Sequence, residues 1–375
     1  MGALDEIGAI DTKAMDIEEL RTELSRHLKR VLLPLSLMDL ENYEPLPRDW
    51  DILDAVATKV EDAEARHKVD ILDEAGYLKL GNMHYVREEF EKALERYSRA
   101  AAMHGSPKAL KNKGIALINL KRFSEAEAPL QKSLDGDAKD PETWFFMAIR
   151  WEYAGDGRYK DQDGMKKALE CYDSALELKK DFDVAFYNKG VLLSLMGRKE
   201  EAMKLITEWL QKHPASDKGW VDRGLLLRNM GNIDGAIKCY DNAILINPEC
   251  DLALVNKGTA LYSKGLYEEA LECLEKAIKI RPDTAIAWCN KGAVLGSLGK
   301  LEESIECYDK ALEIDPSFKG AITNKNTALE QMRAMVSLDV QDQGRRKAQD
   351  TTREKAAAKT MATKKGEKGP KKGRK

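Results

Sequence analysis

The chain has 375 residues, of which 43 % are hydrophobic and 33 % are charged, and its formal net charge is −3 at pH 7. This composition is typical of a folded water-soluble protein, and no run of eighteen apolar residues predicts a membrane span. The N-terminal stretch MGALDEIGAIDTK is acidic and lacks the apolar core of a secretory signal, so the sequence predicts a cytoplasmic location.

The small net charge conceals two segments of opposite charge. Residues 341–375 contain 13 Lys and Arg against 4 Asp and Glu, a net charge of +9. The rest of the chain contains 48 basic and 60 acidic residues, a net charge of −12. We therefore expect an acidic body that carries a basic C-terminal tail.

The first 73 residues form an N-terminal helical region. Apolar residues at spacings of three and four predict two amphipathic helices, which Pro34 separates. The residues that mark them are Ile17, Leu20, Leu24, Leu28 and Val31, and then Ile52, Leu53, Val56, Val60 and Ala63. This region either caps the element that follows or pairs with a second copy of the chain.

From residue 74 onward a pattern of about 34 residues recurs in register. In its clearest copy, residues 285–318, two runs of helical periodicity meet at Gly299, and Pro316 stops the second run. Small residues such as Gly292 let the two helices approach closely, and large residues such as Tyr308 and Trp288 fill the gaps. Each copy is therefore expected to be a helical hairpin, with tryptophans wedged between stacked neighbours.

We predict seven hairpins followed by a capping helix. The hairpins span residues 74–106, 107–140, 141–182, 183–216, 217–250, 251–284 and 285–318. The third contains an insertion, residues 156–164, between its two helices, and this polar loop is expected to be solvated. Residues 319–337 should form the capping helix, and residues 338–375 should be disordered because they have almost nothing to bury.

The pattern resembles the signature of the tetratricopeptide repeat (TPR) family, W-x2-L-G-x2-Y followed by A-x3-F and P. Lys113, Lys189, Lys257 and Lys291 replace the usual leucine before the glycine, and the resulting NKG-type repeats resemble archaeal TPR proteins. The resemblance implies an all-α, right-handed superhelical solenoid. It also implies a non-enzymatic scaffold that binds peptide segments of partner proteins in a concave groove.

In TPR proteins, residues of the first helix of each hairpin line this groove. Position 6 here is Asn112, Asn188, Asn256, Asn290 and Asn324. This resembles the asparagine ladder of the TPR region of O-GlcNAc transferase, but the asparagines are equally consistent with a copied repeat consensus. The other implied groove residues are Lys108, Lys111, Phe145, Tyr153, Tyr187 and Tyr262.

No residue pattern predicts catalysis, a metal site or a cofactor. The five histidines are scattered, and four cysteines recur at one position of their repeats without a local metal-binding partner. Asp161, Asp163 and Gly164 resemble part of a calcium loop, but Tyr172 stands where the closing glutamate would be.

An alternative function rests on the tail. A nucleic-acid- or ribosome-associated factor could use it as an electrostatic anchor for a polyanion. The basic residues concerned are Lys364, Lys365, Lys368, Lys371, Lys372, Arg374 and Lys375. The sequence leaves the partner's identity and the oligomeric state open, and no membrane partner is expected.

Overall fold

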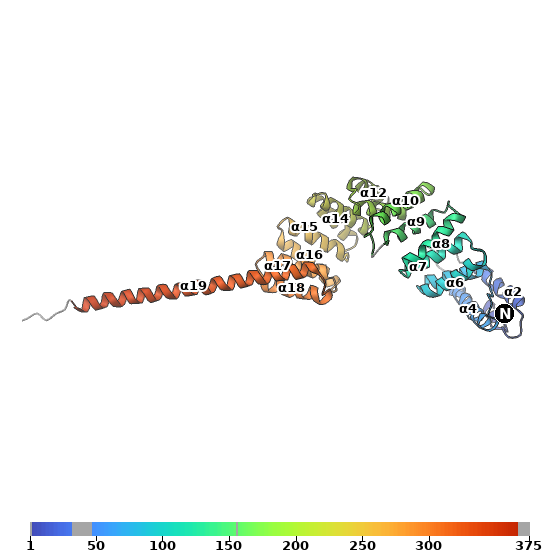
Figure 1. The fold of residues 1–375 in the computed structure, drawn as a ribbon, viewed down its shortest axis with the longest axis horizontal. Coiled ribbons are helices and arrows are strands. Elements are labelled where there is room, and N and C mark those ends of the chain that lie inside the picture. Colours follow the sequence, from blue (N-terminus) through green and yellow to red (C-terminus); the bar gives the residue numbers. More distant parts are fainter. Residues whose placement is uncertain (1, 32–46, 155–156, 367–375) are drawn as a thin grey trace, which may run out of the picture. The chain divides into compact units, whose positions relative to one another are not determined.

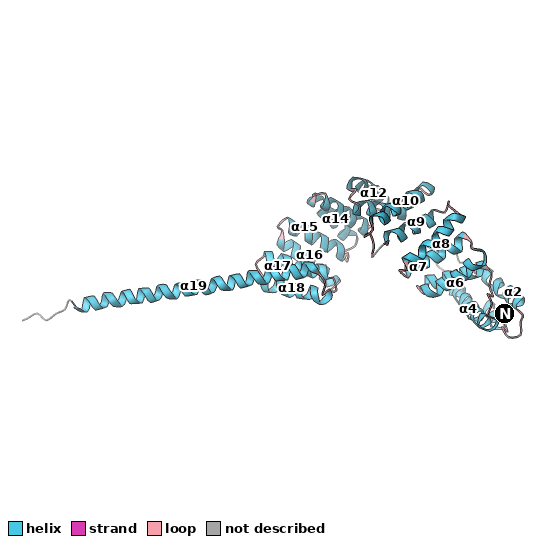
Figure 2. Ribbon diagram, viewed as in Figure 1, coloured by secondary structure: helices cyan, strands magenta, loops and turns pink. Residues whose placement is uncertain are grey.

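A computed structural model describes residues 2–31, 47–154 and 157–366, which contain helices and no strand (Figures 1 and 2). The chain consists of two compact units, residues 1–209 and 210–375, and the boundary between them falls within α12. The helices of the first unit are α1 (Ala3–Gly8), α2 (Ile17–Lys29), α4 (Pro47–His67), α5 (Glu74–Val86), α6 (Phe90–His104), α7 (Pro107–Asn119), α8 (Phe123–Gly136), α9 (Pro141–Glu152), α10 (Gln162–Leu178), α11 (Asp183–Leu195) and α12 (Lys199–Lys212). Those that follow are α13 (Asp217–Asn229), α14 (Ile233–Ile246), α15 (Asp251–Ser263), α16 (Tyr267–Ile280), α17 (Ala285–Ser297), α18 (Leu301–Ile314) and α19 (Lys319–Gly366).

Consecutive helices pack as hairpins, and consecutive hairpins stack within each unit to form an all-α solenoid. The first helix of every hairpin begins at the first residue of a predicted repeat. Side-chain N-caps explain some of these starts, since Asp73 and Ser216 accept hydrogen bonds from the backbone N–H groups three residues on. Glycines with φ near +80° follow the first helices of the later hairpins, as at Gly299 with φ of 78°.

In the first, fifth and seventh hairpins a glycine of the first helix approaches a tyrosine of the second closely, and in the second and sixth the facing residue is a leucine. A Cβ atom built on Gly81 would lie 2.3 Å from the ring of Tyr97, and one on Gly224 would lie 2.5 Å from the ring of Tyr240. Both rings are fully buried. These tyrosines, together with Tyr172, are therefore the main large side chains of the hairpin cores.

The tryptophans are less buried than the sequence predicted. Trp220 and Trp288 are only half-buried. Each indole Nε1 donates a hydrogen bond of 2.8–2.9 Å to the carbonyl oxygen of the proline six residues earlier, Pro214 or Pro282. An indole that makes this bond must keep its polar edge near the turn between hairpins, so it cannot enter the core completely.

The NKG lysines form ion pairs between hairpins as well as covering apolar surface. Lys257 Nζ lies 2.7 Å from Asp241 Oδ1, and Lys291 Nζ lies 2.9 Å from Glu275 Oε1. Lys189 pairs in the same way with Asp173, and Lys325 with Asp309. In each pair the acid follows directly after the tyrosine or leucine that packs in the preceding hairpin core. We call this series the lysine ladder.

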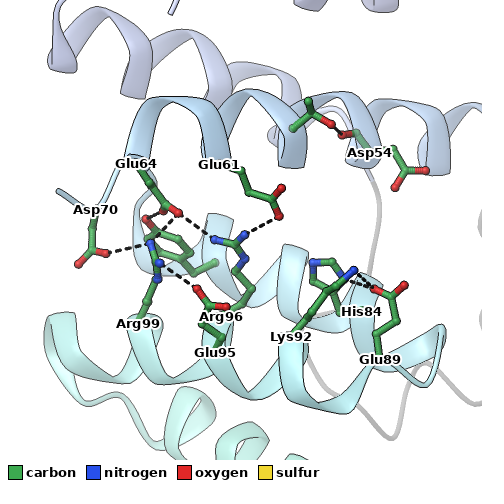
Figure 3. A network of polar contacts seen from close by, with 12 residues as sticks. Asp54, Glu61, Glu64, Asp70, His84, Glu89, Lys92, Glu95, Arg96 and Arg99 are labelled. Carbon is green, nitrogen blue, oxygen red and sulfur yellow. Dashed lines mark hydrogen bonds and ion pairs between the residues drawn. The ribbon is translucent and has the colours of Figure 1, made fainter. Parts of the chain in front are cut away.

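The N-terminal helices contact the first hairpin through a polar network (Figure 3). Arg96 of α6 is buried, and its guanidinium bonds Glu64 Oε2 at 3.0 Å and Glu61 Oε1 at 2.9 Å, both on α4. Arg99 Nη1 also lies 2.6 Å from Glu64 Oε2. These contacts join α4 to α6 of the first hairpin.

The C-terminal segment differs from its prediction. Helix α19 packs on α18 and then continues to Gly366, whereas we expected a cap ending at residue 337 and disorder from residue 338. Ala, Lys and Arg predominate in its second half, and these residues favour helix without any tertiary contact. Because this segment has few apolar residues, it cannot form a hydrophobic core, but it can still form a helix. Residues 367–375 of the predicted tail lie outside the described residues.

Within the described ranges, no helix combines the length and the apolar character needed to cross a lipid bilayer.

Candidate functional site

Asn112 and Lys111 are not available to a peptide. Asn112 is fully buried, and its Nδ2 donates to Asn82 Oδ1 at 3.3 Å, an oxygen that also accepts from the Tyr97 hydroxyl at 2.7 Å. Lys111 is also buried, and its Nζ lies 2.5 Å from Oε2 of Glu142 on α9, in the next hairpin. The prediction that these two residues line a groove is therefore wrong, because both groups join one hairpin to the next.

Phe145 and Tyr187 are core residues as well. The Phe145 ring lies 5.3 Å from that of Phe182, and the Tyr187 ring lies 4.6 Å from that of Trp209. Both side chains are nearly inaccessible to solvent. Their position in the repeat predicted the correct helix face, but large neighbours in these particular hairpins cover them.

The three middle asparagines of the predicted ladder form contacts with other residues of the same chain. Asn256 Nδ2 donates to the Leu252 carbonyl oxygen at 2.8 Å, and Asn290 Nδ2 donates to Thr259 Oγ1 at 3.0 Å. Half-buried Asn188 contacts the Tyr172 phenol. A peptide would have to displace these bonds, so the described chain does not present an even row of free amides.

Asn324 and Tyr262 are brought together at a cavity of about 260 Å³ in the C-terminal unit. We call it the α17–α19 cavity, since most of its lining comes from these two helices. Its other residues are Ala293, Gly296, Ser297, Ser304, Tyr308, Thr327, Ala328 and Gln331. Ser297, Thr327 and Gln331 stand at repeat positions 13, 9 and 13, which the family pattern assigns to the groove, so their positions could have predicted them.

The lining is polar but carries no charged side chain. The Tyr262 hydroxyl and Ser297 Oγ lie 3.1 Å apart, and Ser304 Oγ donates to the Gly292 carbonyl oxygen at 2.7 Å. Burial raises the pKa of the Tyr308 phenol, so this group stays neutral at pH 7. Neutral hydroxyls and amides above a floor of alanine and glycine suit a ligand that is itself uncharged and hydrogen-bonding.

Most described residues of the inserted loop in the third hairpin are exposed, as expected, but Arg158 and Tyr159 contact α9. Arg158 Nη2 lies 2.7 Å from Glu152 Oε2, and the Tyr159 hydroxyl lies 3.1 Å from the same oxygen. The Arg158 guanidinium also sits over the ring of Tyr153, 5.3 Å from its centre. The loop therefore covers part of the face on which Tyr153 was expected to meet a peptide.

The remaining predicted residues are dispersed. Lys108 is exposed on α7. Lys364 and Lys365 lie in α19, while Lys368, Lys371, Lys372, Arg374 and Lys375 lie outside the described residues. No group of His, Cys, Asp or Glu in the described ranges could hold a metal ion.

Models of the tetratricopeptide repeat match several parts of the chain. Models described as "Tetratricopeptide repeat" match residues 78–141 and 285–318, and one described as "TPR repeat" matches residues 258–299. A model of the "Psidin, N-terminal TPR repeats region" matches residues 159–261. The search of curated proteins found no match.

Solved structures share the fold at low sequence identity. A tetratricopeptide repeat protein from Parabacteroides merdae is 16 % identical, with a TM-score of 0.55 over 68 % of this chain and 98 % of that one. The structure of the APC/C hetero-tetramer Cut9–Hcn1 is 15 % identical, with a TM-score of 0.55 over 88 % of this chain and 67 % of that one. At these identities the likeness concerns the fold alone.

Proposed function

Because the chain is built of tetratricopeptide repeats, we propose that it is a non-enzymatic scaffold that binds an extended peptide segment of a partner protein. The observation that carries this proposal is the α17–α19 cavity, where Asn324 and Tyr262 meet on groove-facing positions. The NKG triplets support an archaeal-type repeat. All six cysteines are free, which supports a reducing, cytoplasmic location.

The size and chemistry of the cavity favour a peptide over a small organic ligand. Its volume of about 260 Å³ lies below the ~300–1,000 Å³ typical of small-molecule sites, so it suits one side chain and the adjoining peptide group. Among the described residues, Asn324 Nδ2 contacts only Cys289 Sγ, at 3.9 Å, so its amide, like that of Gln331, can still donate to and accept from a peptide backbone. Each such bond contributes about 0.5–1.5 kcal/mol net, so several contacts must act together.

Peptides selected from a displayed library on the full-length chain provide the test. Ser297→Trp should fill the cavity and weaken binding of the selected peptides at least about tenfold, a loss of about 1.4 kcal/mol. Ser297 is exposed, so the larger side chain should not disturb the core. Fluorescence titration of the selected peptides into the wild type and this variant measures the two affinities.

Ser263→Trp is the matched control. Ser263 is an exposed serine at the same position of the preceding hairpin, but it lies outside the lining of the cavity. Its substitution should change affinity by less than about twofold. Equal binding by both variants would mean that the selected peptides bind elsewhere and would refute the cavity as the site.

A second candidate function follows from α19. Arg345, Arg353 and Lys355 are exposed on this helix, in the part beyond the predicted cap. Such residues can bind a polyanion without reading its sequence.

Binding of a 20-nucleotide RNA at several salt concentrations tests this function. Replacing the three residues by glutamine should reduce the slope of log binding affinity against log salt concentration by up to about three. Replacing exposed Lys238, Lys276 and Lys279 on the hairpins should leave it unchanged, and an unaltered slope in both variants would exclude α19 as the anchor.

A further inference from the structure

The lysine ladder is interrupted at the junction between the first and second hairpins. Lys113 stands on α7 at the position held by Lys189, Lys257, Lys291 and Lys325 in their hairpins. The residue that should provide its acid, the one directly after Tyr97 on α6, is Ser98. Within the described part of the chain, Lys113 pairs with no carboxylate, whereas each of the other four lysines does.

A cavity of about 380 Å³ opens at this junction, between α6 and α8 with α7 as its floor. We call it the Lys113 cavity. Leu94, Leu117 and Pro129 form its buried apolar surface, and Ser98 stands beside Lys113 in the lining. The cavity therefore lies where Ser98 replaces the acid that pairs with the equivalent lysine at four other positions of the ladder.

The rim of the Lys113 cavity has an excess of positive charge. Lys113, Arg122 and Lys132 face a single acid, Glu125. Arg122 already binds Glu125 at 2.6 and 2.7 Å, so this acid is largely neutralised. Lys113 and Lys132 therefore provide the excess positive charge, next to the apolar surface of the cavity. Together they favour a ligand that carries an anionic group next to an apolar one.

We propose that the Lys113 cavity binds an acidic segment of a partner protein, with an Asp or Glu carboxylate on Lys113 and a neighbouring leucine-like side chain on the apolar floor. The carboxylate is favoured because the four equivalent lysines already bind Asp or Glu from the preceding hairpin, at 2.7–2.9 Å for Lys257 and Lys291. The partner's carboxylate would take the place that Ser98 leaves vacant. This site lies in the N-terminal unit and does not depend on the proposed groove.

The probe is the peptide acetyl-Ala-Leu-Asp-Leu-Ala-amide, titrated into full-length, isotope-labelled protein while the backbone amide resonances of Ser98, Lys113 and Leu117 are followed. We expect saturable shifts at these residues, and about tenfold weaker binding for the same peptide with Asn in place of Asp. Absence of saturable shifts up to the solubility limit of the peptide would overturn the proposal.

Two variants locate the contact. Ser98→Asp completes the ladder from within the chain and should weaken peptide binding at least about tenfold, as should Lys113→Met, which keeps an apolar stem. Lys257→Met is the matched control, since it removes a ladder lysine that already has its acid, and the shifts should be unchanged. Circular dichroism verifies folding of each variant.

The remaining outcomes are equally decisive. If Ser98→Asp and wild type bind the peptide equally, the carboxylate does not occupy the ladder position and the proposal is wrong. If inorganic phosphate at the same concentration produces the same shifts and competes with the peptide, the cavity is a general anion site, and the acidic-peptide proposal is overturned in favour of that simpler one.

Discussion

Tyr240→Ala should lower the free energy of unfolding of the C-terminal unit by about 3–5 kcal/mol. The Tyr240 ring is fully buried, among Val221, Ala253 and other small residues, and it contacts Gly224 so closely that no larger residue fits there. Removing it leaves a cavity that the rigid helices on either side cannot close. Urea denaturation followed by circular dichroism measures the loss.

Removing the hydroxyl group from Tyr240 or from Tyr172 provides a second comparison of stability. The Tyr240 hydroxyl is buried and has no hydrogen-bond partner among the described residues, so Tyr240→Phe should change stability by no more than about 0.5 kcal/mol, or increase it. The Tyr172 hydroxyl donates to buried Glu152 Oε1 at 2.6 Å, so Tyr172→Phe should cost about 1–3 kcal/mol. Equal losses in the two phenylalanine variants would contradict this description of the hairpin core.

The hairpins were predictable because their signal is repeated. A small residue on the first helix and a large one on the second, such as Gly224 and Tyr240, mark the contact between the two helices of a copy. The register of the other copies identifies this contact even where one copy departs from the pattern. The burial of Trp288 was not predictable, since size alone suggests a core residue. Its depth depends on the bond from Nε1 to the Pro282 carbonyl oxygen, a contact that recurs between Trp220 and Pro214 but that the structure was needed to reveal.

The candidate site was predictable only in part, for a related reason. Repeat position determines which helix face a residue occupies, and Asn324 and Tyr262 do lie at a cavity. Whether a side chain on that face is free depends on neighbours that differ between repeats. Asn82 beside Asn112 and Thr259 beside Asn290 are such neighbours, and they turn predicted ligand-binding amides into links between hairpins.

The second large effect is expected at the contact between α4 and α6, where Arg96→Met should cost about 3–5 kcal/mol. Only 5 % of the Arg96 side chain and 9 % of the Glu64 side chain are exposed, so the substitution leaves a poorly solvated carboxylate with fewer partners. Methionine keeps most of the side-chain volume, which separates the loss of charge from the loss of packing. The loss should appear in urea denaturation of the full chain as early unfolding of the first hairpin.

Glu61→Gln is the matched control, because Glu61 pairs with the same guanidinium but is 58 % exposed. Solvent screens this pair, so its loss should cost less than about 1 kcal/mol. The double variant Arg96→Met with Glu64→Gln should recover part of the stability, because the buried carboxylate, which only Arg99 still pairs, is gone and the amide oxygen still accepts from the Tyr77 hydroxyl. If Glu64→Gln adds its own loss to that of Arg96→Met instead, α4 is held on the first hairpin by packing against α6 rather than by the pairing of these two charges.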